Sequence, residues 1–302
     1  DATQGWIPTT DDDVTDAPSK KNMEGIFAFG EPSTDITNLI SDAGVVATDV
    51  SGVGTARYKP GACEYGEDKG IIGFGYAGSL PGTAVTNLVS NVGVVSSDVT
   101  GVGTARRDVA ACSYGEDKGI FGFGEVTSGN TAVTNLVSNS GVVASDTAAV
   151  VGVSARYGAR ACEYGDDKGI FAYGTPTTAV SNLVSNVGVV SSDVTGVGTA
   201  RTSLGACSYG GDKGIFGFGS GLTAVTNLVS NVGVVSADVT GVGTARSGSA
   251  ATQYGGDKGI FGFGYDGSVT NISNLVSNAG VVATDTTGVG TARAELGACS
   301  FN

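Results

Sequence analysis

Histidine is absent from this chain of 302 residues, and methionine and tryptophan occur only once each. Without histidine the chain cannot build a Ser-His-Asp or Cys-His nucleophilic site, and most zinc geometries are excluded with them. Proline is also scarce, at six residues, and no apolar run is long enough to cross a bilayer as a helix. These absences argue against the common triad enzymes and against membrane insertion.

Basic residues are also fewer than acidic ones. The chain has 16 Lys and Arg against 29 Asp and Glu, which gives a formal net charge of −13. An acidic surface repels phosphate backbones, so the composition disfavours nucleic-acid binding. Glycine, in contrast, is abundant at 51 residues, and the apolar residues are mainly Val, Ile, Phe and Ala. That mixture is typical of short strands joined by tight turns.

Three sequence blocks recur six times along the chain. The block 117–124 recurs at 212–219 and 257–264, and with small changes at 68–75, 167–174 and 23–30. A second block reads Thr-Asn-Leu-Val-Ser-Asn, and a third reads Gly-Val-Gly-Thr-Ala-Arg. The glycine that opens the Gly-Ile pair of each repeat stands at positions 25, 70, 119, 169, 214 and 259. Such regular spacing is the signature of a repeat architecture.

Each repeat reads as four strands, with Ala-Cys-Ser-Tyr, Gly-Ile-Phe-Gly-Phe, Thr-Asn-Leu-Val-Ser and Val-Val-Ser-Ser-Asp as the typical segments. Four strands every 45 to 50 residues is the period of a β-propeller. The first repeat lacks its first strand, and a surplus copy follows the last repeat at 298–301. The sequence therefore predicts an all-β, six-bladed propeller over residues 25–302. Each blade has four antiparallel strands, and the C-terminal strand completes the first blade and removes both exposed edges.

Residues 1–24 precede the repeats and are predicted to form an extended acidic arm. Asp11, Asp12, Asp13 and Asp16 could bind calcium, but they lack the spacing and the glycine of a calcium loop. We therefore interpret the segment as a polar tether.

At two segments the chain resembles kelch-repeat propellers. Residues 246–251 are similar to that family's Arg-x-Gly-His-Ala segment, and residues 259–264 are similar to its strand that ends in paired glycines. The match covers residues 25–302, but the family's His and Trp are missing and the paired glycines are separated by a Phe. The resemblance implies blade number and strand order, and no ligand. The near-identity of the repeats also resembles tandem-repeat proteins encoded by bacteriophages, including cyanophages, and by environmental viruses.

Residues that recur in every repeat are interpreted as architecture, because a single site requires asymmetry. Six Asp residues and six Arg residues form one such set, which we expect to pair and fix one loop per blade. The Asp-Lys pairs that begin at Asp68, Asp117, Asp167, Asp212 and Asp257 are expected in solvated hairpin turns. Five cysteines share one repeat position, where Thr252 stands in the sixth, and this indicates a small buried side chain between blades rather than a disulfide.

No catalytic, cofactor or metal site is predicted. Residues 73–78 satisfy the dinucleotide-binding pattern of glycines, but they lie between two strands with no helix after them. Catalysis by carboxylates alone would remain as the enzymatic alternative.

The repeats differ in length mainly between the second and third strands, and all of these connections share one face of a propeller. Variable loops on a constant scaffold are where recognition is commonly found. The residues predicted to bind a partner are Tyr76, Leu80, Pro81, Glu125, Tyr265 and Asp266.

These features predict a non-enzymatic structural or attachment module without a cofactor. The expected setting is a virion, as a phage tail, fibre or decoration protein, or the extracellular space. Other virion or surface proteins would bind through the arm and the variable loops. The alternative is a secreted or cell-surface glycan-binding propeller of bacterial origin.

Overall fold

The computed structural model describes residues 23–302 of the chain. These residues contain no helix, and so none that could span a membrane. They form six three-stranded antiparallel sheets and one two-stranded ribbon. The prediction of an all-β chain is therefore confirmed. The predicted arm lies outside the described residues except for Met23 and Glu24, and Glu24 begins the first strand.

Each repeat supplies one sheet, and we number the sheets along the chain. Sheet 1 contains β1 (Glu24–Ala28), β2 (Thr37–Ile40) and β20 (Gly297–Phe301); sheet 2 contains β3 (Gly61–Tyr65), β4 (Lys69–Gly73) and β5 (Thr86–Val89); sheet 3 contains β6 (Ala110–Tyr114), β7 (Lys118–Gly122) and β10 (Thr134–Val137). Sheet 4 contains β11 (Arg160–Tyr164), β12 (Lys168–Ala172) and β13 (Ser181–Val184); sheet 5 contains β14 (Gly205–Tyr209), β15 (Lys213–Gly217) and β16 (Thr226–Val229); sheet 6 contains β17 (Ala250–Tyr254), β18 (Lys258–Tyr265) and β19 (Val269–Val276). The ribbon consists of β8 (Glu125–Val126) and β9 (Gly129–Asn130).

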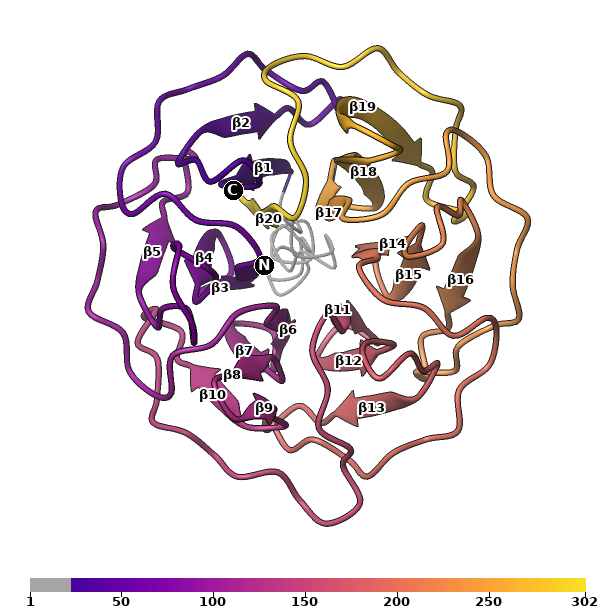
Figure 1. Ribbon diagram of the computed structural model, residues 1–302. Coiled ribbons are helices and arrows are strands. Elements are labelled where there is room, and N and C mark those ends of the chain that lie inside the picture. Colours follow the sequence, from indigo (N-terminus) through magenta and orange to yellow (C-terminus); the bar gives the residue numbers. More distant parts are fainter. Residues whose placement is uncertain (1–22) are drawn as a thin grey trace, which may run out of the picture.

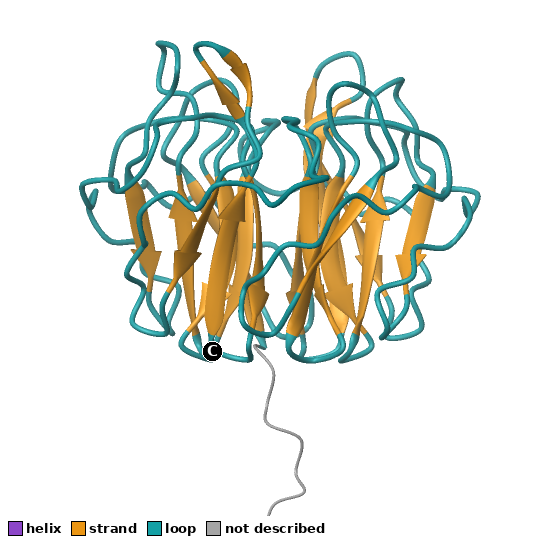
Figure 2. Ribbon diagram, turned by 90° about the horizontal axis from the view of Figure 1, so that it is seen from below, coloured by secondary structure: helices purple, strands orange, loops and turns teal. Residues whose placement is uncertain are grey.

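Figure 1 shows the six sheets arranged in a ring around a central axis, with one strand of each sheet next to the axis. The two ends of the described part of the chain meet in sheet 1, where Ile26 on β1 faces Cys299 on β20 in an antiparallel register. The predicted pairing of the C-terminal strand with the first repeat is therefore confirmed. Figure 2 shows the C-terminus at one face of the ring and the taller loops at the opposite face. We call these faces the turn face and the loop face.

The prediction of a fourth strand in each sheet is wrong. In the first repeat, the fourth segment touches β2 only at two isolated bridges, Ile40 with Val46 and Thr37 with Val50. Between the bridges, the buried Asn38 side chain donates hydrogen bonds to the Ala47 carbonyl and to the Asp49 carboxylate. A side chain therefore takes the place of part of the backbone ladder, and the same arrangement recurs in the other five repeats.

The apolar core is divided among the six seams between neighbouring sheets. Each seam has one cluster of buried residues drawn from the two sheets that flank it. One of these clusters joins sheet 6 to sheet 1, with Phe27 packed edge-on against Phe263 at 5.2 Å between ring centroids. Four of the other five seams have an aromatic pair of the same kind, whereas the seam between sheets 1 and 2 has Ile72 in place of the second ring.

The recurring cysteines are free, buried and located at these seams. A Cβ atom added to Gly119 would lie 2.6 Å from Cys63 Sγ of the preceding sheet, and one added to Gly70 would lie 2.4 Å from Cys299 Sγ. The glycine that opens each middle strand therefore makes room for the sulfur of its neighbour. This confirms the predicted role of the cysteine position as a small buried side chain between repeats.

A buried arginine crosses each seam. Arg106 stacks on the Phe74 ring of sheet 2, with its guanidinium carbon 4.2 Å from the ring centroid. From there it donates hydrogen bonds to the Phe123 carbonyl at 2.8 Å and to Asn135 Oδ1 at 2.6 Å, both in sheet 3. Phe123 has a φ of 63°, a strained value for an aromatic residue, and this conformation is stabilised by the bond to its carbonyl.

Candidate functional site

The recurring Asp and Arg residues pair between neighbouring repeats and not within one. Asp146 of the third repeat lies 3.9 Å from Arg106 of the second, and Asp49 lies 3.9 Å from Arg293 of the last repeat. The connection between the Asp and the Arg of one repeat leads from one sheet to the next. The two residues therefore lie at different seams and do not pair with each other. Burial lowers the pKa of five of the arginines to about 10, which leaves them cationic at neutral pH. These residues link neighbouring repeats across the seams.

The pKa values of the six Asp residues determine how the stability of the folded protein should depend on pH. Burial raises the pKa of Asp98, but hydrogen bonds from Thr55 and Asn87 outweigh it and leave the pKa below its ordinary value of 3.8. The other five have lowered pKa values for the same reasons. A carboxyl group whose pKa is lower in the folded than in the unfolded protein stabilises the folded state when the pH is above the unfolded-state pKa. This stabilisation is lost as the pH falls through the folded-state pKa.

We therefore expect the unfolding temperature to be nearly constant above about pH 5 and to fall steeply below about pH 4. Thermal unfolding by circular dichroism across this range measures the effect. The variant Asp98→Asn should take up fewer protons on unfolding and show a shallower fall. Glu116→Gln, at an exposed turn position, is the control. Equal slopes for all three proteins would contradict the assignment.

The hairpin turns form the turn face, as predicted. In each turn the lysine pairs with the aspartate before it, for example Lys213 with Asp212 at 2.7 Å and Lys258 with Asp257 at 2.8 Å. The lysine side chains keep about two fifths of their surface exposed. These are solvated pairs that contribute little binding energy.

On the loop face, two of the predicted partner residues are joined through a residue that the sequence did not single out. Arg107 lies with its guanidinium carbon 5.1 Å from the Tyr76 ring centroid and forms an ion pair with Glu125 at 2.9 Å. Tyr58 packs edge-on against Tyr76 at 5.2 Å between centroids. The side chains of Tyr58, Tyr76, Arg107 and Glu125 thus form a connected row across the connections of sheets 2 and 3.

Leu80 and Pro81 belong to the same connection as Tyr76. Leu80 is 53% exposed, and Pro81 lines a shallow groove of about 380 Å³ together with Thr104, Val126 and Ser128. The β8–β9 ribbon, which only the third repeat has among the described residues, forms one wall of the groove. Four of the six predicted partner residues therefore lie on two adjacent connections.

Tyr265 and Asp266 are placed elsewhere. They lie in the extended hairpin of β18 and β19 on sheet 6, where Tyr265 is 45% exposed and bridges to Ser247. Sheet 1 separates this hairpin from sheet 2 in the ring (Figure 1). The six residues predicted to bind a partner therefore belong to two separate surfaces on the loop face.

The third repeat carries a further irregularity at the rim of the ring. The two-residue insertion after Asp146 makes the connection between β10 and β11 project outward (Figure 1), and Val151 is 98% exposed there. Behind it lies an apolar groove of about 200 Å³, lined by Leu136, Val150, Val153 and Val189.

The axis of the ring is the region that sequence reasoning missed. Its lining comes from the six inner strands, and two columns of that lining are nearly constant, namely alanine in every repeat and cysteine in five. The column after the cysteine varies and consists of Glu64, Ser113, Glu163, Ser208, Gln253 and Ser300. A column-by-column comparison of the repeats would have shown it, because charge enters this position in only two of the six.

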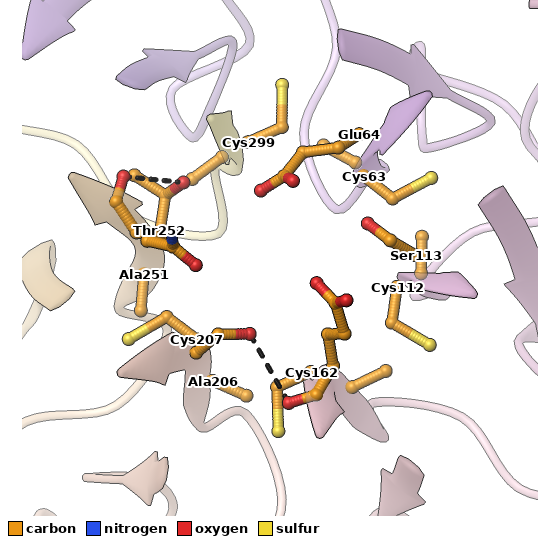
Figure 3. A pocket seen from close by; sticks show the side chains of 17 residues that line it. Cys63, Glu64, Cys112, Ser113, Cys162, Ala206, Cys207, Ala251, Thr252 and Cys299 are labelled. Atoms are coloured by element: carbon orange, nitrogen blue, oxygen red, sulfur yellow. Dashed lines mark hydrogen bonds between the residues drawn. The ribbon is translucent and has the colours of Figure 1, made fainter. Parts of the chain in front are cut away.

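Five of these six residues, all but Ser300, line a cavity of about 40 Å³ near the turn face. Figure 3 shows Glu64 and Ser113 pointing into this cavity, whereas the labelled cysteines point outward to the seams. Ser300 donates a hydrogen bond to Glu64, and Ser208 donates one to the Glu163 carbonyl. Burial raises the pKa of the Cys63 thiol well above its usual value, with Cys112 and Glu64 adding to the effect.

Nearer the loop face, Lys59, Asp108 and Glu295 belong to a second varying column, which is charged in three of the six repeats, and Arg160 joins them from a different repeat position. Asp108 is almost fully buried and pairs with Lys59 at 2.9 Å, while Arg160 pairs with Glu295 at 3.0 Å. Burial and the Glu295 charge raise the pKa of Asp108. The pKa of Lys59 is also raised, because the nearby acids outweigh its burial. Two acids and two bases thus neutralise one another at this end of the axis.

Among residues 23–302 no cluster of three or more His, Cys, Asp or Glu side chains has the geometry of a metal site. No protein family and no curated protein sequence matches the chain.

Proposed function

We propose that the chain is a six-bladed β-propeller that serves as a non-enzymatic attachment module, with the loop face as its partner surface. One observation carries the proposal. The contacts that hold the seams recur in repeat after repeat, while the connections on the loop face differ in length and side chains. The Arg–Asn hydrogen bond is 2.5 to 2.6 Å at five seams, whereas the β8–β9 ribbon and the long β18–β19 hairpin occur once each among the described repeats.

The setting that best suits such a module is an assembled particle, with a phage tail, fibre or decoration position as the specific form. Two separate raised surfaces on one face, around sheets 2 and 3 and on sheet 6, suit contact with an extended partner such as a neighbouring subunit or a host surface. The acidic composition favours solubility over nonspecific adhesion to nucleic acid.

A glycan-binding propeller is the second candidate, and one observation favours it. The row of Tyr58, Tyr76, Arg107 and Glu125 combines aromatic rings with an ion pair. Aromatic rings that pack on apolar faces, together with charged hydrogen-bonding groups of fixed orientation, are the chemistry that a sugar ring requires.

Loop grafting tests the proposal. The short connection 175–181 of sheet 4 replaces 76–86 and 265–273, which removes Tyr76, Leu80 and Pro81 from the first raised surface and shortens the β18–β19 hairpin of the second. We expect the graft to lose at least tenfold in binding, measured by co-sedimentation with the native particle or cell envelope and on a glycan array. Loss on the particle alone supports the particle role, and loss on the array alone supports the glycan role.

The matched control is Glu116→Gly, which gives one turn of sheet 3 the Gly-Gly-Asp-Lys sequence that sheets 5 and 6 already have. It alters the turn face and should bind as the unmodified protein does. The proposal fails if the graft folds and binds with unchanged affinity, or if Glu116→Gly alone abolishes binding.

A further inference from the structure

The apolar groove at the rim of the ring arises from the irregular connection of the third repeat. In the other five repeats this connection contains a glycine that packs against the chain before the third strand; a Cβ atom added to Gly101, for example, would lie 1.9 Å from the Ala84 oxygen. The third repeat has Ala148 and Ala149 at this point instead. Because an alanine cannot approach a carbonyl so closely, the connection lies further out (Figure 1) and leaves a groove over Ala132, the counterpart of Ala84.

The groove lies at the seam between sheets 3 and 4 and is lined mainly by apolar side chains. One wall is formed by Leu136 of β10 and by the connection 147–153, and the other by residues 187–190, which follow β13. None of the described residues that line it is charged, and Val187 and Val189 are 68% and 56% exposed. An exposed patch of apolar side chains commonly marks an interaction site.

The groove begins near the turn face. A Cβ atom added to Gly115, in the hairpin turn between β6 and β7, would lie 2.8 Å from the carbonyl oxygen of Asn186, which precedes the wall 187–190. Met23 lies at the same face, because its carbonyl accepts a hydrogen bond at 2.8 Å from Gly255 in the hairpin turn of sheet 6. Residues 1–22 therefore join the ring at the face where the groove begins.

These first 22 residues contain one pair of large apolar residues side by side, Trp6 and Ile7, and Trp6 is the only tryptophan of the chain. Trp6 stands 17 residues before Met23, and an extended chain of that length spans about 56 Å. A compact domain of this size has a radius of gyration of about 19 Å, so Trp6 is within reach of the groove. A tethered segment also meets the groove at an effective concentration on the order of 1 mM, which favours it over a second copy in dilute solution.

The size and chemistry of the groove suit an indole ring. Its volume is about 200 Å³, and an apolar cavity of about 150 Å³ is large enough to hold a benzene molecule. We propose that Trp6 and Ile7 of the chain's own N-terminal segment dock in this groove, with Trp6 as the side chain that fills it. This inference does not depend on the proposed function.

Tryptophan fluorescence tests the proposal on the full chain, because Trp6 is the only tryptophan and its emission is excited separately from that of tyrosine. In the unmodified protein we expect emission at a shorter wavelength, and severalfold weaker quenching by acrylamide, than in the protein unfolded in urea. The variant Val189→Asp places a charge at an exposed position of the apolar groove. It should shift the emission to longer wavelength and raise the quenching to that of an exposed tryptophan, because docking would bury the charge.

The matched control is Val234→Asp, which makes the same change at the same position of the fifth repeat. Val234 is 63% exposed and does not line the groove, so this variant should keep the emission and the quenching of the unmodified protein. A milder variant, Val187→Ser, gives the turn of the fourth repeat the residue that Ser140 provides in the third, and it should show intermediate quenching. It carries the test if circular dichroism shows that Val189→Asp does not fold.

Equal quenching in the unmodified protein and in the folded groove variants would overturn the proposal, and so would an increase of the same size in Val234→Asp. Dilution of the unmodified protein should leave the emission unchanged, because groove and tryptophan belong to one chain. A shift to longer wavelength on dilution would show that a second copy supplies the tryptophan and would contradict docking within the chain.

Discussion

Removal of residues 297–302 is expected to prevent folding of the ring. The deletion takes away β20, exposes the inner edge of β1, and removes the buried side chains of Cys299 and Phe301 from the seam with sheet 2. Loss of a buried phenylalanine alone costs roughly 3–5 kcal/mol, which is a large part of the stability of an ordinary domain. We expect an aggregated product without a cooperative unfolding transition, as measured by size-exclusion chromatography and calorimetry.

A circular permutant is the control for this deletion. The backbone nitrogen of Met23 donates to the Asn302 carbonyl at 3.0 Å, so the two ends of the described chain can be joined by a short linker. A permutant that begins at Lys59 and ends at Tyr58 makes β20 and β1 consecutive strands. It should fold and unfold cooperatively. A soluble, cooperatively folded deletion variant would show that β20 is dispensable.

Replacement of a seam arginine is expected to have the next largest effect. Arg106→Met keeps most of the side-chain volume on the Phe74 ring but leaves the Phe123 carbonyl and Asn135 Oδ1 without their buried donor. Removal of one partner from such a buried polar set costs about 3–5 kcal/mol. In urea, the variant should unfold at a lower midpoint concentration than the unmodified protein. The dependence of the unfolding free energy on urea concentration should change little.

The seam between sheets 5 and 6 supplies a matched comparison. There, within the described residues, Arg246 Nη2 and Asn274 Oδ1 are both buried without a hydrogen-bond partner, although Arg246 still donates to the Phe263 carbonyl at 2.8 Å. Arg246→Met therefore breaks one hydrogen bond fewer than Arg106→Met. It should destabilise the protein by about 1–2 kcal/mol less. An equal loss in the two variants would mean that stacking on the aromatic ring, and not the Asn contact, stabilises the seams.

The sequence was sufficient to predict the all-β class and the pairing of the C-terminal strand with the first repeat. These features follow from local strand patterns and from a surplus strand at 298–301, which has no other partner. The number of strands per sheet could not be predicted in the same way. A valine-rich segment reads as a strand, but a buried Asn38 side chain bonds to the Ala47 carbonyl within it and interrupts the ladder.

The surfaces proposed to bind a partner were also predicted only in part. Length differences located the loop face, and Tyr76 and Glu125 were both identified there. Their connection through Arg107 depends on how sheets 2 and 3 sit beside each other, which spacing along the chain does not reveal. Glu64 and Glu163 were overlooked because each belongs to a strand that recurs, and only the ring brings them to one cavity.

The constant and the varying residues therefore separate in space. The constant residues, such as Arg106, Asn135 and Cys63, lie at the seams and give every sheet the same neighbours. The varying residues lie on the loop face and along the axis. A ring of this kind changes its loops without loss of the seam contacts, which is the property that an attachment module requires.

Amide hydrogen exchange on β1 and β20 tests the central claim most directly, because it examines the unmodified chain. If the two ends close the ring, the backbone amides of Ala298–Phe301 should exchange about as slowly as those of β14, the inner strand of sheet 5. Exchange of these amides at rates typical of a frayed terminus, while β14 remains protected, would contradict the closed arrangement.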